Sequence, residues 1–213
     1  MTELIGILDY GVGNLHSLSN AIKGLGSRIQ IIDSTQDFSK YSKLILPGVG
    51  AFPHAMEQIK INDYEKSIYE FIRSGKPVLG ICLGMQILAR KSFEIKETMG
   101  LGIFDADVHP LSDLVSKSQK PIIPNMGWQK VSIKKNSSLI MRSSTDSEFL
   151  YFAHSFGLKE APQVSKNITS SFMFFGTPII SSIEIDNVFG LQFHPEKSGK
   201  NGLSILRNFI NIK

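Results

Sequence analysis

PVLGICLGMQILAR (Pro77–Arg90) is the stretch of sequence that decides the fold. Its first part, Pro77–Ile81, is a short apolar run typical of a buried strand, and Leu83–Arg90 has the spacing of a helix. Cys82 stands between the two, with a glycine two residues away on either side. This is the pattern of a nucleophile elbow, a sharp strand-to-helix turn that holds a reactive side chain in strained backbone geometry. The stretch therefore predicts an α/β fold with a nucleophile at the end of a strand.

The chemistry expected of Cys82 follows from the same turn. A thiol at a helix N-terminus is stabilised as the thiolate by the helix dipole and by free N–H groups, and such N–H groups can also bind an oxyanion. The alternative interpretation is a buried structural cysteine, the commoner fate of a free thiol. Gly80 and Gly84 favour the catalytic interpretation, because only small neighbours let strand and helix approach so closely.

The segments before the elbow extend the α/β pattern. Apolar runs typical of strands occur at Leu4–Tyr10, Arg28–Asp33 and Lys43–Gly48. Helical spacing follows the first run from Leu15 to Leu25, and another helical stretch continues to Ile72. Strands that alternate with helices indicate a parallel sheet covered on both faces. We therefore expect one domain over residues 1–213, with a flavodoxin-like, open, mostly parallel sheet and helices on both faces.

The second half of the chain has a different character. Shorter strand-like segments separated by turn residues, such as Lys135-Asn136, predict an antiparallel extension of the sheet in the C-terminal half. These segments are WQKVSI (128–133), FLYFAHSF (149–156), PIISSIEI (178–185) and NVFGLQF (187–193). A helix over Gly202–Ile212 is expected to close the fold, and the polar segment Leu111–Lys120 is expected to be a surface loop.

Composition excludes several classes of function. The 213 residues carry 23 Lys and Arg against 19 Asp and Glu, and these basic residues are scattered, so we expect no nucleic-acid binding. A single cysteine excludes an internal disulfide and fits a reducing compartment. Without a signal peptide or an apolar stretch long enough for a bilayer, we expect a cytoplasmic protein with no membrane partner. His16, His54 and His109 lack metal-ligand spacing, so no metal is expected.

A thiolate nucleophile needs a base, and LQFHPEKS (Leu191–Ser198) offers one. If the segment is extended, His194 and Glu196 point the same way, and Pro195 between them disfavours a helix. A carboxylate beside the imidazole fixes its tautomer and stabilises its protonated form. The motif is weak evidence alone, but together with the cysteine elbow it predicts a Cys–His–Glu triad.

Two glycine-rich segments follow earlier strands. LPGVGAF (Leu46–Phe52) ends the third strand, where a Pro-Gly-x-Gly loop can present N–H groups to a tetrahedral intermediate. An ordinary βα turn is the alternative, and Cys82 favours the functional interpretation. Gly11–Gly13 resembles the start of a dinucleotide fingerprint, but His16 stands where the third glycine belongs. We therefore interpret that segment as a tight βα turn.

Taken together, GICLGMQ, HPEKS and LPGVGAF resemble the motifs of the class I, triad-type glutamine amidotransferases. Among these the chain looks most similar to the glutaminase subunits of imidazole glycerol phosphate synthase, through DYGVGNLHS (9–17), IPNMGWQ (123–129), FAHSF (152–156) and GLSILRNF (202–209). The resemblance covers essentially the whole chain. It departs from the usual pattern at Asn125, where the family has histidine, and at Gly157, where a bulkier residue is common.

The resemblance implies hydrolysis of L-glutamine to glutamate and ammonia, without a cofactor. Its implied residues are the triad Cys82, His194 and Glu196; the oxyanion hole Val49, Gly50 and Leu83; the substrate site Gly50, Gln86, His154, Ser155 and Phe156; and the partner interface Asn125, Met126, Trp128 and Lys197. The implied partner is a cyclase subunit of (β/α)₈ type, which forms a heterodimer with this chain. It would use channelled ammonia to make imidazole glycerol phosphate and aminoimidazole carboxamide ribotide in histidine biosynthesis.

Three alternatives stay open on the sequence. A paralogous glutaminase subunit would supply ammonia to the amidation of a surface sugar. A non-catalytic binding subunit would keep the fold but not the activity, against which the intact Cys82, His194 and Glu196 argue. A cysteine peptidase or esterase would use the same scaffold on another substrate, although Gln86 and the PGVG loop favour glutamine.

Overall fold

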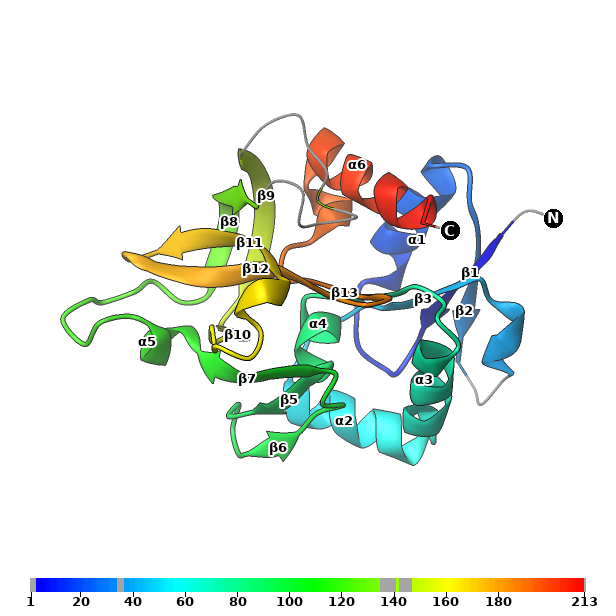
Figure 1. The fold of residues 1–213 in the computed structure, drawn as a ribbon, viewed down its shortest axis with the longest axis horizontal. Helices are drawn as coiled ribbons and strands as arrows, with labels where there is room; N and C mark the ends of the chain where they lie inside the picture. Colours follow the sequence, from blue (N-terminus) through cyan, green and yellow to red (C-terminus); the bar gives the residue numbers. More distant parts are fainter. Residues whose placement is uncertain (1–2, 34–36, 135–140, 142–146, 213) are drawn as a thin grey trace.

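The computed structural model describes residues 3–33, 37–134, 141 and 147–212. Strands and helices alternate through the first half of the chain, and strands dominate the second half (Figure 1). The turn expected at Lys135-Asn136 lies outside the described residues. Across the described parts, no helix has the length and apolar character needed to cross a membrane.

One large sheet forms the centre of the molecule. Its strands are β1 (Leu4–Leu8), β2 (Arg28–Ile32), β3 (Lys43–Leu46), β4 (Val78–Ile81), β8 (Asn125–Ile133), β9 (Ser147–His154), β11 (Ile168–Phe174), β12 (Thr177–Ile185) and β13 (Val188–Leu191). Their order is β2-β1-β3-β4-β13-β12-β11-β8-β9. The first five run parallel, in the order of flavodoxin-like folds. The other four continue the sheet with antiparallel pairing, so the predicted fold class is confirmed.

Helices cover both faces of the parallel strands, as Figure 1 shows. On one face lie α1 (Leu15–Gly24) and α6 (Gly199–Ile210), and on the other lie α2 (Phe52–Ile61), α3 (Tyr64–Arg73) and the short α4 (Leu83–Ile87). Among the described residues, two clusters of buried apolar side chains form the core. One includes Leu18, Ile22 and Phe209 from α1 and α6, and the other includes Met56 and Ile68 from α2 and α3. Burial of these amphipathic helix faces is the main stabilising contribution.

A second, smaller sheet was not predicted from the sequence. It consists of β5 (Ala89–Ser92), β6 (Thr98–Met99), β7 (Phe104–Pro110) and β10 (Phe156–Leu158), in the order β10-β7-β5-β6. The helix expected over Leu83–Arg90 was therefore wrong in its last part, because α4 ends at Ile87 and Ala89 already belongs to β5. Pairing of β5 with the distant β7 overrides the local helical preference.

Other boundaries also differ from expectation. The single helical stretch expected up to Ile72 is two helices, because Asp63 takes a left-handed conformation with φ of 53° between α2 and α3. Aspartate tolerates this conformation better than most residues. The expected loop Leu111–Lys120 begins with a helical turn, α5 (Leu111–Leu114), whose Leu111 is buried. Strand β11 was missed, and three short 3₁₀ segments complete the described elements: η1 (Phe38–Lys40), η2 (Ser165–Asn167) and η3 (Pro195–Lys197).

Strand β13 matters most for the position of the site. It was expected within the antiparallel extension, but it also pairs in parallel with β4. Because β3, β4 and β13 are neighbours and run in the same direction, their carboxyl ends meet at one edge of the sheet. That edge therefore brings together the loop after Leu46, the elbow after Ile81 and the segment after Leu191.

Candidate active site

Cys82 occupies the strained turn that the sequence predicted. Its backbone angles are φ 53° and ψ −108°, between the end of β4 and the start of α4. A Cβ atom at Gly84 would lie 1.7 Å from the carbonyl oxygen of Leu46, and one at Gly80 would lie 2.5 Å from the carbonyl oxygen of Gly84. Both distances are impossible for a real side chain, so Gly84 is required for α4 to pack against β3, and Gly80 is required for α4 to pack back against β4. The elbow prediction is confirmed at the level of the backbone.

His194 and Glu196 meet as predicted, although on a different backbone. The Nδ1 atom of His194 lies 2.9 Å from Oε1 of Glu196, and both side chains are buried. Glu196 belongs to η3, so the expectation of an extended segment was wrong. The backbone N–H of His194 donates to the Tyr151 carbonyl, and the Ser198 hydroxyl donates to the His194 carbonyl. These bonds hold the imidazole against its carboxylate.

The second ring nitrogen of His194 faces the nucleophile. Within the described residues, Nε2 makes no hydrogen bond of standard geometry. Burial by itself lowers the pKa of His194, but the Cys82 sulfur and the Glu196 carboxylate both act in the opposite direction and raise that pKa above its ordinary value. The imidazole is therefore poised to hold a proton beside the sulfur, as a thiolate–imidazolium pair requires.

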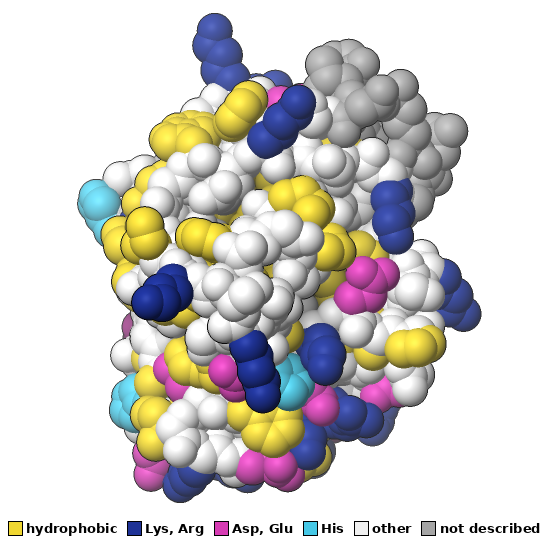
Figure 2. All heavy atoms as spheres, turned by 90° about the vertical axis from the view of Figure 1, so that its left-hand side faces the viewer, with side chains coloured by type: hydrophobic (Ala, Val, Ile, Leu, Met, Phe, Trp, Pro, Cys, Tyr) yellow, Lys and Arg dark blue, Asp and Glu magenta, His cyan; other side chains and the backbone are white. Residues whose placement is uncertain are grey.

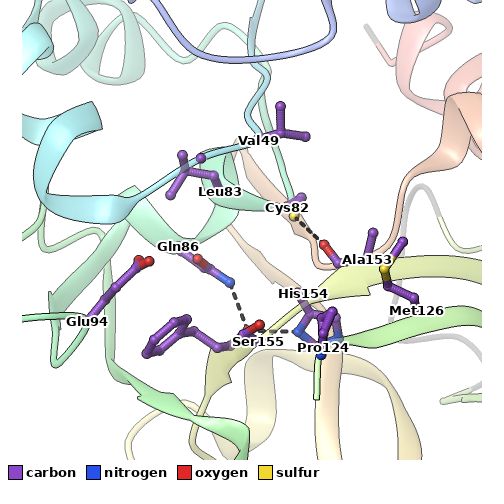
Figure 3. A pocket seen from close by; sticks show the side chains of 12 residues that line it. Val49, Cys82, Leu83, Gln86, Glu94, Pro124, Met126, Ala153, His154 and Ser155 are labelled. Atoms are coloured by element: carbon purple, nitrogen blue, oxygen red, sulfur yellow. Dashed lines mark hydrogen bonds between the residues drawn. The ribbon is translucent and has the colours of Figure 1, made fainter. Parts of the chain in front are cut away.

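A pocket of about 280 Å³ opens over Cys82 (Figure 3). It is lined by Val49, Gly50, Cys82, Leu83, Gln86, Glu94, Pro124, Met126, Ala153, His154, Ser155 and Phe156. Every residue predicted for the oxyanion hole or for substrate binding is in this set. Residues from five separate parts of the sequence thus surround one small, half-open space beside the sulfur, as expected of a site for a small molecule.

Glu94 is a pocket residue that sequence reasoning missed. Its Oε2 accepts a hydrogen bond of 2.8 Å from the backbone N–H of Phe52. Partial burial raises the pKa of the Glu94 carboxyl, and the Phe52 N–H partly opposes this. Figure 3 shows the carboxylate at the far side of the pocket from Cys82. No motif surrounds Glu94 in KSFEIKE, so only the fold brings it to the site.

His154 is held by hydrogen bonds on both ring nitrogens. Nδ1 lies 2.7 Å from the Phe156 carbonyl oxygen, and Nε2 lies 2.9 Å from Nδ2 of Asn125. Because the carbonyl can only accept, Nδ1 carries the hydrogen, and Nε2 accepts from the amide. Gln129 donates to Oδ1 of Asn125 and so fixes the amide orientation. Burial lowers the pKa of His154 to about 4, so the ring is neutral.

Asn125 therefore differs from its predicted place. It was expected at the partner interface, but its side chain is only 4% exposed and points inward to His154. Its neighbours on β8 point outward, since successive strand residues alternate between faces. Met126 is 63% and Trp128 53% exposed.

The other predicted interface residues lie together. The Lys197 ammonium lies 5.8 Å from the centre of the Tyr151 ring, and that ring contacts Trp128 edge to face. Figure 2 views the end of the molecule formed by the C-terminal strands, where exposed apolar side chains interrupt the polar surface. Met126 also lines the pocket, so this surface is continuous with the site. Among the described residues, no group of three or more metal-ligating side chains lies together.

Comparison with known proteins identifies relatives over the full length. Residues 6–212 match the family "Glutamine amidotransferase class-I". The imidazole glycerol phosphate synthase subunit HisH of Wolinella succinogenes is 41% identical, over 98% of this chain and 100% of that protein. The HisH subunit of Caldanaerobacter subterraneus is also 41% identical, over 97% of each chain. Among solved structures, PurLQS from Thermotoga maritima shares the fold with a TM-score of 0.73 at 22% identity, over 99% of each chain.

Proposed function

The chain belongs to the class I glutamine amidotransferases and, within them, to the HisH subunits of imidazole glycerol phosphate synthase, and from this premise we propose that Cys82, His194 and Glu196 are its catalytic triad. The protein hydrolyses L-glutamine to glutamate and ammonia. The observation that carries the triad assignment is the buried contact of His194 with Glu196 at the sheet edge where the Cys82 elbow stands.

The proposed chemistry proceeds through a thioester. The Cys82 sulfur attacks the side-chain amide carbon of glutamine, and His194 gives its proton to the departing ammonia. Water then attacks the γ-glutamyl thioester, and His194 takes the proton of that water as the sulfur leaves. Glu196 keeps Nδ1 of the imidazole hydrogen-bonded throughout, which leaves Nε2 for the transfers.

The pocket supports specific roles for its other residues. We assign the oxyanion of the tetrahedral intermediate to the N–H of Leu83 and to the Val49–Gly50 segment, both beside Cys82 in the pocket. The α-ammonium group of glutamine would bind the Glu94 carboxylate, the acidic group among the pocket residues. Gln86 and the segment from His154 to Phe156 would hold the remaining backbone atoms of the substrate.

As a subunit of imidazole glycerol phosphate synthase, the protein works with a cyclase subunit that uses the ammonia. We propose that this partner is a (β/α)₈ barrel, that it forms a heterodimer with this chain, and that Met126, Trp128 and Lys197 contribute to the interface. Met126 supports this placement because it borders both the pocket and the exposed surface. Shielded transfer keeps ammonia unprotonated, and thus nucleophilic, until it reaches the cyclase. A cytoplasmic location stays a prediction.

The alternatives receive less support. Curated relatives at 37–41% identity over nearly the whole chain are HisH subunits, which favours histidine biosynthesis over sugar amidation. A non-catalytic subunit would have no need of the strained Cys82 backbone or of a buried His194–Glu196 pair. A peptidase would need an extended cleft for a chain, whereas this pocket is a small space of about 280 Å³.

The triad is tested by Cys82→Ala in the complex with the cyclase subunit. We expect glutamine hydrolysis to disappear while synthase activity with added ammonium salt remains, since external ammonia bypasses the missing step. Glutamate release and imidazole glycerol phosphate formation are measured in parallel. Normal glutamine hydrolysis by the Cys82→Ala complex would show that the triad assignment is wrong.

A further inference from the structure

Gln192 is a buried polar residue to which the triad gives no role. It follows the last residue of β13, two positions before His194, and its side chain is 0% exposed. Its neighbours Leu191 and Phe193 are buried and apolar, so a polar side chain between them is unexpected. Burying a primary amide among such residues is unfavourable unless its polar atoms find partners.

Both ends of the Gln192 amide have a partner in the active site. Its Nε2 lies 3.6 Å from the Cys82 sulfur, and its Oε1 lies 3.0 Å from Nε2 of Gln86. The Cys82 sulfur also lies 3.9 Å from the Ala153 carbonyl oxygen, a longer contact in which a thiol would be the donor. Gln192 is thus the amide that joins the nucleophile to the wall of the substrate pocket.

The direction of the hydrogen bonds follows from a backbone carbonyl. Nε2 of Gln86 lies 2.9 Å from the Phe156 carbonyl oxygen, which can only accept, so Gln86 must present its NH₂ group there. The same NH₂ group also donates to Gln192, so the Gln192 side chain accepts this bond with its Oε1 atom. The NH₂ group of Gln192 is therefore turned toward the sulfur.

A donor in this position has a specific use. In the proposed reaction the sulfur develops negative charge as it attacks, and again when the thioester is hydrolysed. An N–H aimed at it stabilises that charge and limits the directions in which the side chain can point. Unlike the N–H of His194, this donor is present at every stage of the reaction, because an amide does not give up its proton.

We propose that Gln192 is a positioning residue, which donates an N–H to the Cys82 sulfur and holds it in the direction of attack. Its own orientation is set by Gln86 and the Phe156 carbonyl. The inference rests on the proposed function, since it takes Cys82 as the nucleophile.

The test compares Gln192→Met and Gln192→Glu in the complex with the cyclase subunit. Methionine keeps the shape and removes the donor, and glutamate replaces the donor with an acceptor. We expect kcat for glutamine hydrolysis to fall about ten- to hundredfold in Gln192→Met, the effect of one hydrogen bond to a charged group, with little change in KM. The pH profile of Cys82 alkylation by iodoacetamide should shift to higher pH in Gln192→Met. The shift should be larger in Gln192→Glu.

Controls separate this role from a structural one. Ammonia-dependent synthase activity reports whether each variant folds and assembles. Gln30→Met, the same change on the distant edge strand β2, should leave kcat and the alkylation profile unaltered. If Gln192→Met does not fold, Gln192→Asn takes its place, because asparagine retains the amide but withdraws it by one methylene. The same fall in kcat and the same shift of the alkylation profile are expected.

The outcomes distinguish this inference from the function beneath it. A wild-type complex that fails to hydrolyse glutamine, or a Cys82→Ala complex that succeeds, overturns the proposed function. An active, Cys82-dependent enzyme whose Gln192 variants keep their kcat overturns the positioning role alone. A loss of kcat with an unchanged alkylation profile overturns the positioning role as well. That result is what damage to packing would produce, because such damage does not act on the charge of the sulfur.

Discussion

At the scale of single residues, position 125 has the most informative chemistry outside the triad. The Asn125 amide donates to Nε2 of His154, while Nδ1 of the same ring donates to the Phe156 carbonyl. An imidazolium could not accept from Asn125, so the arrangement suits only the neutral ring. Burial, the largest influence, lowers the pKa of His154 to about 4, with the His194 charge adding to it. The stability that depends on this neutral ring is fully present above about pH 6.5 and is lost as the pH falls toward about 4.

The first prediction is that one substitution makes the protonated form of His154 the preferred one. In Asn125→Asp the carboxylate can only accept, so His154 must donate from Nε2 as well as from Nδ1 and become an imidazolium. We expect the pKa of His154 to rise from about 4 to above 6.5. Titration of the ring nitrogens by NMR measures this directly. Asn125→Leu is the control, because it removes the donor without adding a charge. A His154 pKa that is the same in both variants would contradict the assigned hydrogen bonds.

At the scale of elements, the loop between β3 and α2 is the place where we expect activity to be controlled. Gly50 has φ of 132°, a conformation that L-residues rarely adopt, and the neighbouring Val49 is 42% exposed. The loop borders the pocket beside Cys82, where the proposed mechanism needs an oxyanion N–H. A peptide that turns in this loop can therefore add or remove a donor without disturbing the sheet.

The second prediction concerns activation through this loop. We expect the isolated subunit to hydrolyse glutamine slowly and to accelerate about 10²–10³-fold with the ligand-bound cyclase, the value of one oxyanion donor. Gly50→Ala should lose most of this acceleration, since alanine restricts the turn. Gly26→Ala is the matched control. Gly26 also has a positive φ (86°), but a Cβ atom added there would meet no other atom within 4 Å. Glutamate release is measured with and without partner and ligand. Full activity of the isolated subunit, or normal acceleration of Gly50→Ala, would exclude this form of gating.

At the scale of the whole molecule, we propose that the exposed surface around β8 contacts the second subunit. Trp128 and Met126 are largely exposed, and Trp128 is supported by Tyr151 from β9. Aromatic side chains held in this way dominate the affinity of many interfaces. The surface reaches the pocket through Met126, so a partner bound there would lie over the point where ammonia is released.

The third prediction tests that surface. Trp128→Ala should weaken binding of the cyclase subunit by about 2 kcal/mol or more, roughly thirtyfold in Kd, while the thermal stability of the isolated subunit changes little. Ile61→Ala is a suitable control, since Ile61 is also a large exposed apolar residue but lies at the end of α2. Titration calorimetry gives both affinities. If Ile61→Ala weakens binding and Trp128→Ala does not, the partner docks elsewhere.

The sequence by itself determined the parts of this protein whose signals are local. The parallel strands, the helices between them and the Cys82 elbow each depend on a short run of residues. His194 and Glu196 are close in the chain, so their contact needs only a turn, and it formed even though the turn is a 3₁₀ segment rather than an extended one. Gln86, His154 and Phe156 were predicted by resemblance, and the pocket contains all of them.

Only the tertiary structure decided what depends on distant pairing. Ala89 and Arg90 follow a helix and were expected to continue it, but pairing with β7 makes Ala89–Ser92 a strand. Glu94 comes to the pocket because that strand leads it there, and Gln192 reaches Cys82 because β13 lies beside β4. The Asn125 side chain turns inward because the alternation of β8 places it opposite His154. In each case the contact joins residues far apart in the chain, so no short stretch of sequence contains both partners.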